Sequence, residues 1–161
     1  MSQQIRLDDY PFHHKTKTRW KDLDAFQHIN NAVFLSYFED ARVGLFERWN
    51  LRPNGKSIIV ASVKVNYYKQ LIHPTDFIIG QKVSRLGNSS FDIQSTLFDL
   101  SKNIISDATI TCVCFDFDKQ EKHGQCEYSG AEFREKETRI EGNYKSRRKA
   151  DERKPTRYRG S

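Results

Sequence analysis

The feature that most constrains this 161-residue chain is a strongly apolar segment, residues 32–49, that directly follows a short polar stretch. Its apolar side chains recur at intervals of three and four residues, which is the spacing of one helix face. They are Val33, Phe34, Leu35, Tyr37, Phe38, Ala41 and Leu45. Asn30 or Asn31 fits the N-cap of the predicted helix, because an Asn side chain can accept a hydrogen bond from the first turn. An apolar face this broad requires a sheet packed against it.

Five strands are predicted around this helix from alternating residues with high β-branched and aromatic content. One precedes the helix and four follow it: residues 13–22, 57–69, 77–85, 90–100 and 104–117. Short turns between the last four imply an antiparallel meander. The sequence therefore predicts an α+β domain in which a five-stranded antiparallel sheet wraps one long helix. The uncovered sheet edges and outer face predict a homodimer, and the sequence leaves open whether dimers pair into a tetramer.

The formal net charge of +6 is concentrated near the C-terminal end. From Lys145 onward there are eight basic and two acidic residues, which leaves 19 residues of each sign in the rest of the chain. A neutral body argues against nucleic-acid binding by the whole domain. We predict a loose lead-in over residues 1–12, one domain over residues 13–141 and a basic, disordered tail over residues 142–161.

The sequence has no apolar run of the roughly 20 residues that a membrane helix needs, and no signal-peptide pattern. We therefore expect a soluble, cytoplasmic protein without membrane insertion. The three cysteines, Cys112, Cys114 and Cys126, lack the paired spacing of zinc ligands, so no metal site is expected.

Candidate chemistry is concentrated in the polar stretch ahead of the helix, which holds Asp22, Asp24, His28, Asn30 and Asn31. Because a helix N-terminus presents unpaired N–H groups and the positive end of a dipole, it can polarise an acyl carbonyl. Asp24 can then attack that carbonyl or deprotonate a water molecule, while His28 orients substrate or carries a proton. The alternatives are that either aspartate merely caps the turn, that His28 is a surface residue, and that Asn-Asn is ordinary turn chemistry.

The run from Arg19 to Arg42 resembles the signature of hotdog-fold thioesterases of the 4-hydroxybenzoyl-CoA thioesterase type. Its segment from Asp24 to Asn31 is also similar to the Asp-x-x-Gln-His-x-Asn-Asn segment of plant acyl-ACP thioesterases. The resemblance implies a hotdog fold whose dimers place the site at the subunit interface. It further implies that Asp24 is the catalytic carboxylate, that His28 is the histidine of the acyl-ACP branch, and that the backbone N–H of Asn31 polarises the thioester carbonyl.

Three positions depart from those families. Phe26 stands where the plant enzymes carry a functional Asn, and Asn31 stands where one bacterial branch has its histidine. The loop of residues 86–89 lacks the basic cluster that holds nucleotide phosphates, so phosphate contacts would fall to Lys69, Lys82, Arg85 or the partner subunit. The expected substrate-binding residues are Phe26, Tyr67, Arg85 and Ser90.

Two functions follow from this reading. The first is hydrolysis of an acyl-CoA or acyl-ACP thioester to the free acid and thiol, without a metal or redox cofactor. The alternative is a non-catalytic hotdog protein that binds acyl chains and docks its basic tail on nucleic acid, an acidic protein or an anionic membrane. The identity of the acyl group does not follow from the sequence.

Overall fold

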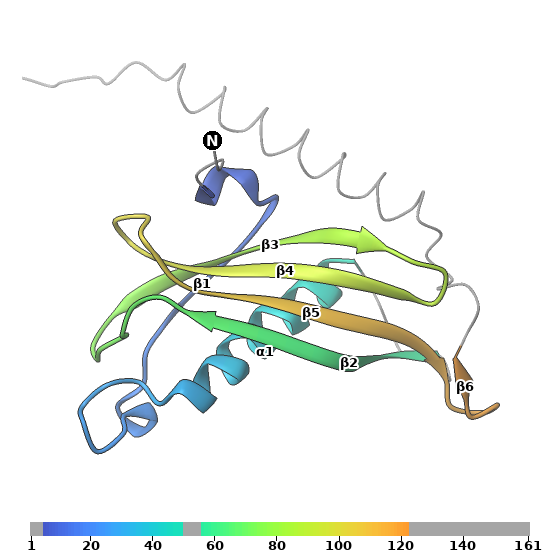
Figure 1. Cartoon of the computed structure of the whole chain (residues 1–161), viewed down its shortest axis with the longest axis horizontal. Helices are drawn as coiled ribbons and strands as arrows, with labels where there is room; N and C mark the ends of the chain where they lie inside the picture. The colour runs from blue at the N-terminus through green and yellow to red at the C-terminus, as the bar shows by residue number, and fades with distance from the viewer. Residues whose placement is uncertain (1–4, 50–55, 123–161) are drawn as a thin grey trace, which may run out of the picture. The chain divides into compact units, whose positions relative to one another are not determined.

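A computed structural model of the protein describes residues 5–49 and 56–122. One long helix packs against a curved antiparallel sheet (Figure 1), as predicted for the α+β class. The elements, in which η marks a short 3-10 helix, are η1 (Leu7–Asp9), β1 (Phe12–Lys17), η2 (Trp20–Asp22), α1 (Asn31–Arg48), β2 (Lys56–Tyr67), β3 (Asp76–Leu86), β4 (Ser90–Asp99), β5 (Ile104–Asp116) and β6 (Glu121–Lys122). The predicted helix and all five predicted strands are present, and the two-residue β6 pairs with the end of β5.

The order of the strands in the sheet is β1-β3-β4-β5-β2. Figure 1 shows β3, β4, β5 and β2 side by side in this order. The predicted meander is correct for β3, β4 and β5 but wrong for β2, which pairs with β5 rather than with β3. The free side of β3 is occupied by β1, whose Thr16 lies opposite Phe77. The connection of residues 68–75 therefore carries the chain from one edge strand, β2, to the other side of the sheet.

The core lies between α1 and the concave face of the sheet. The buried helix residues are Phe34, Tyr37, Phe38, Ala41 and Leu45, which form the predicted apolar face. Leu35 is 45% exposed and lies outside that face. The Tyr37 ring packs on Phe77 of β3, with centroids 4.9 Å apart, and the Phe34 ring meets Tyr67 of β2 at 5.3 Å. These aromatic contacts tie the first half of the helix to two different strands.

Residues 7–12, which the sequence assigns to a loose lead-in, are packed in the structure. Leu7, Tyr10 and Phe12 are buried, and Leu7 and Tyr10 form a cluster with Phe98 of β4. A Cβ atom at Gly80 would lie 2.7 Å from the Tyr10 ring, so this close approach requires glycine. Leu7 and Tyr10 therefore pack on part of the sheet.

The first strand is shorter than predicted, because β1 ends at Lys17 rather than at residue 22. Thr18 donates its N–H to the carbonyl of Thr75 at 2.9 Å, and the chain then folds into η2. The predicted basic tail, residues 142–161, lies outside the described residues. In the described part of the chain, no helix combines the length and apolarity needed to span a bilayer.

Candidate active site

A tight loop between η2 and α1 carries most of the predicted site residues. Leu23 and Ile29 pair across it as an isolated antiparallel bridge, and Asp24 N–H donates to the His28 carbonyl at 2.8 Å. Gln27 sits at the tip with φ of 64°, a left-handed conformation that is uncommon outside glycine. Across the loop, Ile29 N–H donates to the carbonyl of Leu71 at 2.7 Å, which joins the loop to the β2–β3 connection.

The Asp24 carboxylate uses one oxygen to hold this loop. Its Oδ1 accepts the backbone N–H groups of Phe26 at 2.8 Å and His28 at 3.2 Å. One oxygen of Asp24 therefore caps the turn, as the alternative interpretation predicts. The N–H groups that it caps belong to the loop and not to the helix. Within residues 5–49 and 56–122, no hydrogen bond engages Oδ2 of Asp24 or the imidazole of His28, so both groups remain available for chemistry.

The N-terminus of α1 is capped by Asn30, whose Oδ1 accepts Ala32 N–H at 2.9 Å. Asn30 N–H donates to the Asp22 carbonyl at 2.9 Å, and the Asn30 carbonyl accepts Val33 N–H at 2.9 Å. On the other side, Tyr67 donates its hydroxyl to the Asn31 carbonyl at 2.9 Å. The N–H of Asn31 has no acceptor among the described residues, as expected for the first residue of a helix.

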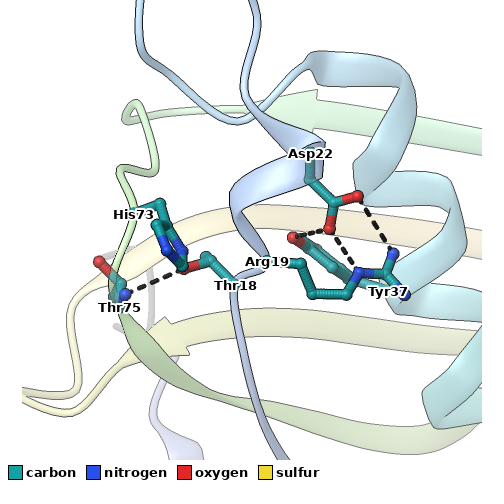
Figure 2. A network of polar contacts seen from close by, with 6 residues as sticks. All are labelled: Thr18, Arg19, Asp22, Tyr37, His73 and Thr75. Carbon is teal, nitrogen blue, oxygen red and sulfur yellow. Dashed lines mark hydrogen bonds and ion pairs between the residues drawn. The ribbon is translucent and has the colours of Figure 1, made fainter.

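Asp22 differs from Asp24 in being buried, with 6% of its surface exposed. Figure 2 shows its carboxylate between Arg19, which donates from Nε at 2.7 Å, and Tyr37, which donates its hydroxyl at 2.8 Å. Burial pushes the pKa of the Asp22 carboxyl upward, but the two hydrogen bonds outweigh burial and leave that pKa below its ordinary value. Burial and the bond to Asp22 both raise the pKa of Tyr37, so the phenol stays protonated and remains a donor.

The same figure shows a second polar group on the approach to the loop. Thr18 Oγ1 accepts Thr75 N–H at 2.9 Å and lies 2.9 Å from Nδ1 of His73 (Figure 2). Together with the Thr18–Thr75 backbone bond, these contacts anchor the β2–β3 connection beside η2. Leu71 in that connection accepts Ile29 N–H. The loop of Asp24 is therefore bonded to a connection that is itself anchored beside η2.

Two adjoining hollows meet at the start of α1. The first, of about 420 Å³, is lined by Asp24, Phe26, His28, Asn30, Asn31 and Gln70. The second, of about 250 Å³, has a more aromatic and aliphatic lining: Ile29, Asn31, Phe34, Tyr67, Tyr68, Lys69, Gln70 and Leu71. Asn31 and Gln70 belong to both hollows. Gln70 was missed by sequence reasoning, because no motif marks it and only the contact between Ile29 and Leu71 brings it to the site.

The structure brings five of the seven predicted site residues to these hollows. Asp24, His28, Asn31 and Phe26 line the first hollow, and Phe26 is 80% exposed; Tyr67 lines the second.

Arg85 and Ser90 lie at the opposite end of the sheet. Tyr67 pairs with Ser106 of β5, whereas Ser90 pairs with Val113, seven residues and thus about 23 Å further along that strand. Arg85 there contacts Ser90 Oγ at 3.3 Å and donates to Asp92 at 2.6 and 2.9 Å.

The other basic residues weighed for phosphate binding are also separated. Lys69 lines the second hollow, whereas Lys82 lies over the Tyr10 ring, 5.0 Å from its centroid. No group of three or more His, Cys, Asp or Glu side chains in the described ranges is placed to hold a metal ion. Cys112 is a buried free thiol, and burial raises its pKa to about 12.

A model of the thioesterase-like superfamily matches residues 18–150 of this chain. The chain is 30% identical over 104 residues to the uncharacterized protein YsmA of Bacillus subtilis, covering 63% of this chain and 68% of the relative. It is 28% identical over 110 residues to the long-chain acyl-CoA thioesterase FadM of Escherichia coli, covering 65% and 83% of the two chains. A thioesterase from Thermus thermophilus, solved with coenzyme A and Zn, superposes with a TM-score of 0.69 at 26% identity, covering 83% of this chain and 96% of that one.

Proposed function

The chain belongs to the thioesterase-like superfamily and has its hotdog fold, and from this premise we propose that it hydrolyses an acyl thioester at the first hollow. One observation carries the proposal: the Asn31 N–H at the helix N-terminus and Oδ2 of Asp24 belong to the same hollow, and neither has a hydrogen-bond partner among the described residues. An oxyanion needs the first group and a nucleophilic attack needs the second.

In the proposed reaction, the thioester carbonyl oxygen accepts the Asn31 N–H, where the helix dipole also favours developing negative charge. Oδ2 of Asp24 either deprotonates a water molecule that attacks the carbonyl carbon, or attacks directly to give a mixed anhydride that water then hydrolyses. The C–S bond breaks, and the products are the carboxylic acid and the free thiol. His28 orients the water or the substrate from the same hollow.

Coenzyme A is the favoured thiol carrier. One relative is named as a long-chain acyl-CoA thioesterase, and one structural neighbour was solved with coenzyme A. In this chain Lys69 lies beside the second hollow and supplies a positive charge for a phosphate group. An acyl carrier protein is the alternative carrier. A cytoplasmic location is still a prediction from the sequence.

A homodimer formed through β2 would complete the site. β2 is an edge strand of the described sheet, and it exposes apolar side chains along its length: Ile59, Val60, Val63 and Tyr67, each 37–43% exposed. Such an edge favours pairing with another strand. Antiparallel pairing of two β2 strands reverses one sheet relative to the other. It would bring Arg85 and Ser90 of the second copy to the end of the sheet where Asp24 lies.

The test is release of free thiol from a panel of acyl-CoA thioesters and aryl-CoA thioesters, followed by the same panel on acyl carrier protein. Wild type is compared with Asp24→Asn, which retains an oxygen to accept the N–H groups of Phe26 and His28 and so preserves the loop. We expect kcat to fall by about a hundredfold or more in Asp24→Asn.

Asp76→Asn serves as the matched control, because Asp76 is exposed at the start of β3 and lines neither hollow. We expect it to keep full turnover. Absence of turnover by wild type on both carriers would overturn the proposal and favour the non-catalytic acyl-binding alternative.

A further inference from the structure

Asp22 contacts α1 both through its backbone and through its side chain, and the proposed reaction uses neither contact directly. Its backbone carbonyl accepts the N–H of Asn30, the N-cap residue, at 2.9 Å. Its side chain reaches the second turn of the same helix, where Tyr37 donates a hydroxyl proton at 2.8 Å in a buried contact. Asp22 therefore forms hydrogen bonds with α1 at two points, at its N-cap residue and on its buried face.

The contact between Asp22 and Tyr37 is held from the outside by Arg19. Its Nε and Nη2 donate to the two carboxylate oxygens at 2.7 and 3.3 Å, and its guanidinium carbon lies 5.7 Å from the centroid of the Tyr37 ring. Asp22 thus has donors on both oxygens, and the Tyr37 ring is in turn packed on Phe77 at 4.9 Å. A buried carboxylate satisfied in this way has little freedom to move.

The peptide group between Asn30 and Asn31 carries the N–H that donates to the thioester carbonyl oxygen in the proposed reaction. The hydrogen bonds around this peptide group determine the direction of that N–H. The Asn30 N–H is held by Asp22, and the Asn30 carbonyl is held by Val33 N–H at 2.9 Å. An oxyanion donor contributes most when it needs no reorganisation during the reaction. The position of Asp22 relative to α1 is thus coupled to the position of the donor.

We propose that Asp22 is a positioning residue for the reaction, and that its bond to Tyr37 sets the geometry of the Asn31 N–H and of the loop that carries Asp24. The inference rests on the proposed thioesterase function. It separates two aspartates that lie two residues apart, one that acts on the substrate and one that orients the groups that do.

Tyr37→Phe tests this inference, because it removes one hydroxyl and keeps the ring in the core. Tyr10→Phe is the matched control, since Tyr10 is also buried and its hydroxyl also makes one buried bond, to Thr96 Oγ1 at 2.6 Å, between the lead-in and β4. Both variants should lower the denaturant midpoint to a similar extent. Only Tyr37→Phe should lower kcat, by about tenfold, with KM within about twofold of wild type.

A second readout does not depend on turnover. Amide hydrogen exchange of residues 23–31 should become faster in Tyr37→Phe and stay unchanged in Tyr10→Phe. Asp22→Asn, which keeps one oxygen to accept the Tyr37 hydroxyl, should retain more kcat than Asp22→Ala.

Full kcat in Tyr37→Phe, or an equal loss of kcat in both tyrosine variants, would overturn the inference. If wild type hydrolyses no thioester, the proposed function fails by itself. Amide hydrogen exchange of residues 23–31 then tests whether Tyr37 orders the loop. Unchanged exchange in Tyr37→Phe would overturn the ordering role of Tyr37 as well.

Discussion

Two arginine–aspartate pairs with the same local chemistry lie at opposite ends of the sheet. In one, Arg19 donates from Nε to Asp22 at 2.7 Å, and in the other Arg85 donates from Nε to Asp92 at 2.6 Å. The arginines are about equally exposed, at 46% and 48%, but the aspartate side chains are not, at 6% and 16%.

The third member of each group explains what the difference means. Asp22 accepts the hydroxyl of Tyr37, which belongs to α1, whereas Asp92 accepts the hydroxyl of Thr111, which lies opposite it on the neighbouring strand β5. The first bond joins elements that no ladder connects, and the second reinforces a ladder that already exists. The same interaction therefore orients a helix in one place and adds little to the architecture in the other.

The largest expected contrast is in stability. Asp22→Ala leaves the buried hydroxyl of Tyr37 without an acceptor, so we expect the free energy of unfolding to fall by about 2–3 kcal/mol. Asp92→Ala should cost clearly less, because the Asp92 side chain is more exposed and its hydrogen bond with Thr111 is only partly buried. Urea unfolding of both variants measures the two values, and equal losses would contradict the distinction between the two pairs.

An intermediate effect concerns Arg85, which the proposed dimer brings to the other subunit's site. Arg85→Ala should raise KM for an acyl-CoA by about fivefold with little change in kcat. The sharper test mixes Arg85→Ala with Asp24→Asn subunits. A mixed dimer then contains one site with both wild-type groups, so the mixture should show a component that turns over at the wild-type KM, which neither variant shows alone. Absence of that component after verified subunit exchange would contradict the arrangement of Arg85 in trans.

The smallest effect is the pH dependence of the Asp22 contribution. Its hydrogen bonds hold the folded-state pKa of Asp22 below the ordinary value of about 3.9, despite the opposing effect of burial. The resulting stabilisation is fully present above that ordinary value and is lost as the pH falls through the lower folded-state pKa. The difference in unfolding free energy between wild type and Asp22→Asn should be constant from pH 7 to about 5 and shrink below about 4. A difference that grows on acidification would contradict this sign.

Predictions from the sequence succeeded where the determining pattern is local. The helix was expected over residues 32–49 and spans Asn31–Arg48, because one continuous apolar stripe and one cap define it. The strand ahead of it ends at Lys17 and not at residue 22, because the chain folds into η2, whose Asp22 bonds to Tyr37 further along the chain. The packing of Leu7 and Tyr10 does not follow from the local sequence either, because their apolar partner Phe98 lies far along the chain.

The sequence by itself determined the α+β class, the long helix and the grouping of Asp24, His28 and Asn31, because these follow from spacing within one short stretch. Only the tertiary structure decided that β2 pairs with β5, that Gln70 joins the site, and that Asp22 rather than Asp24 is buried. Each of these depends on which distant segments meet. Strand alternation fixes which face a side chain takes, but it does not identify the neighbouring strand.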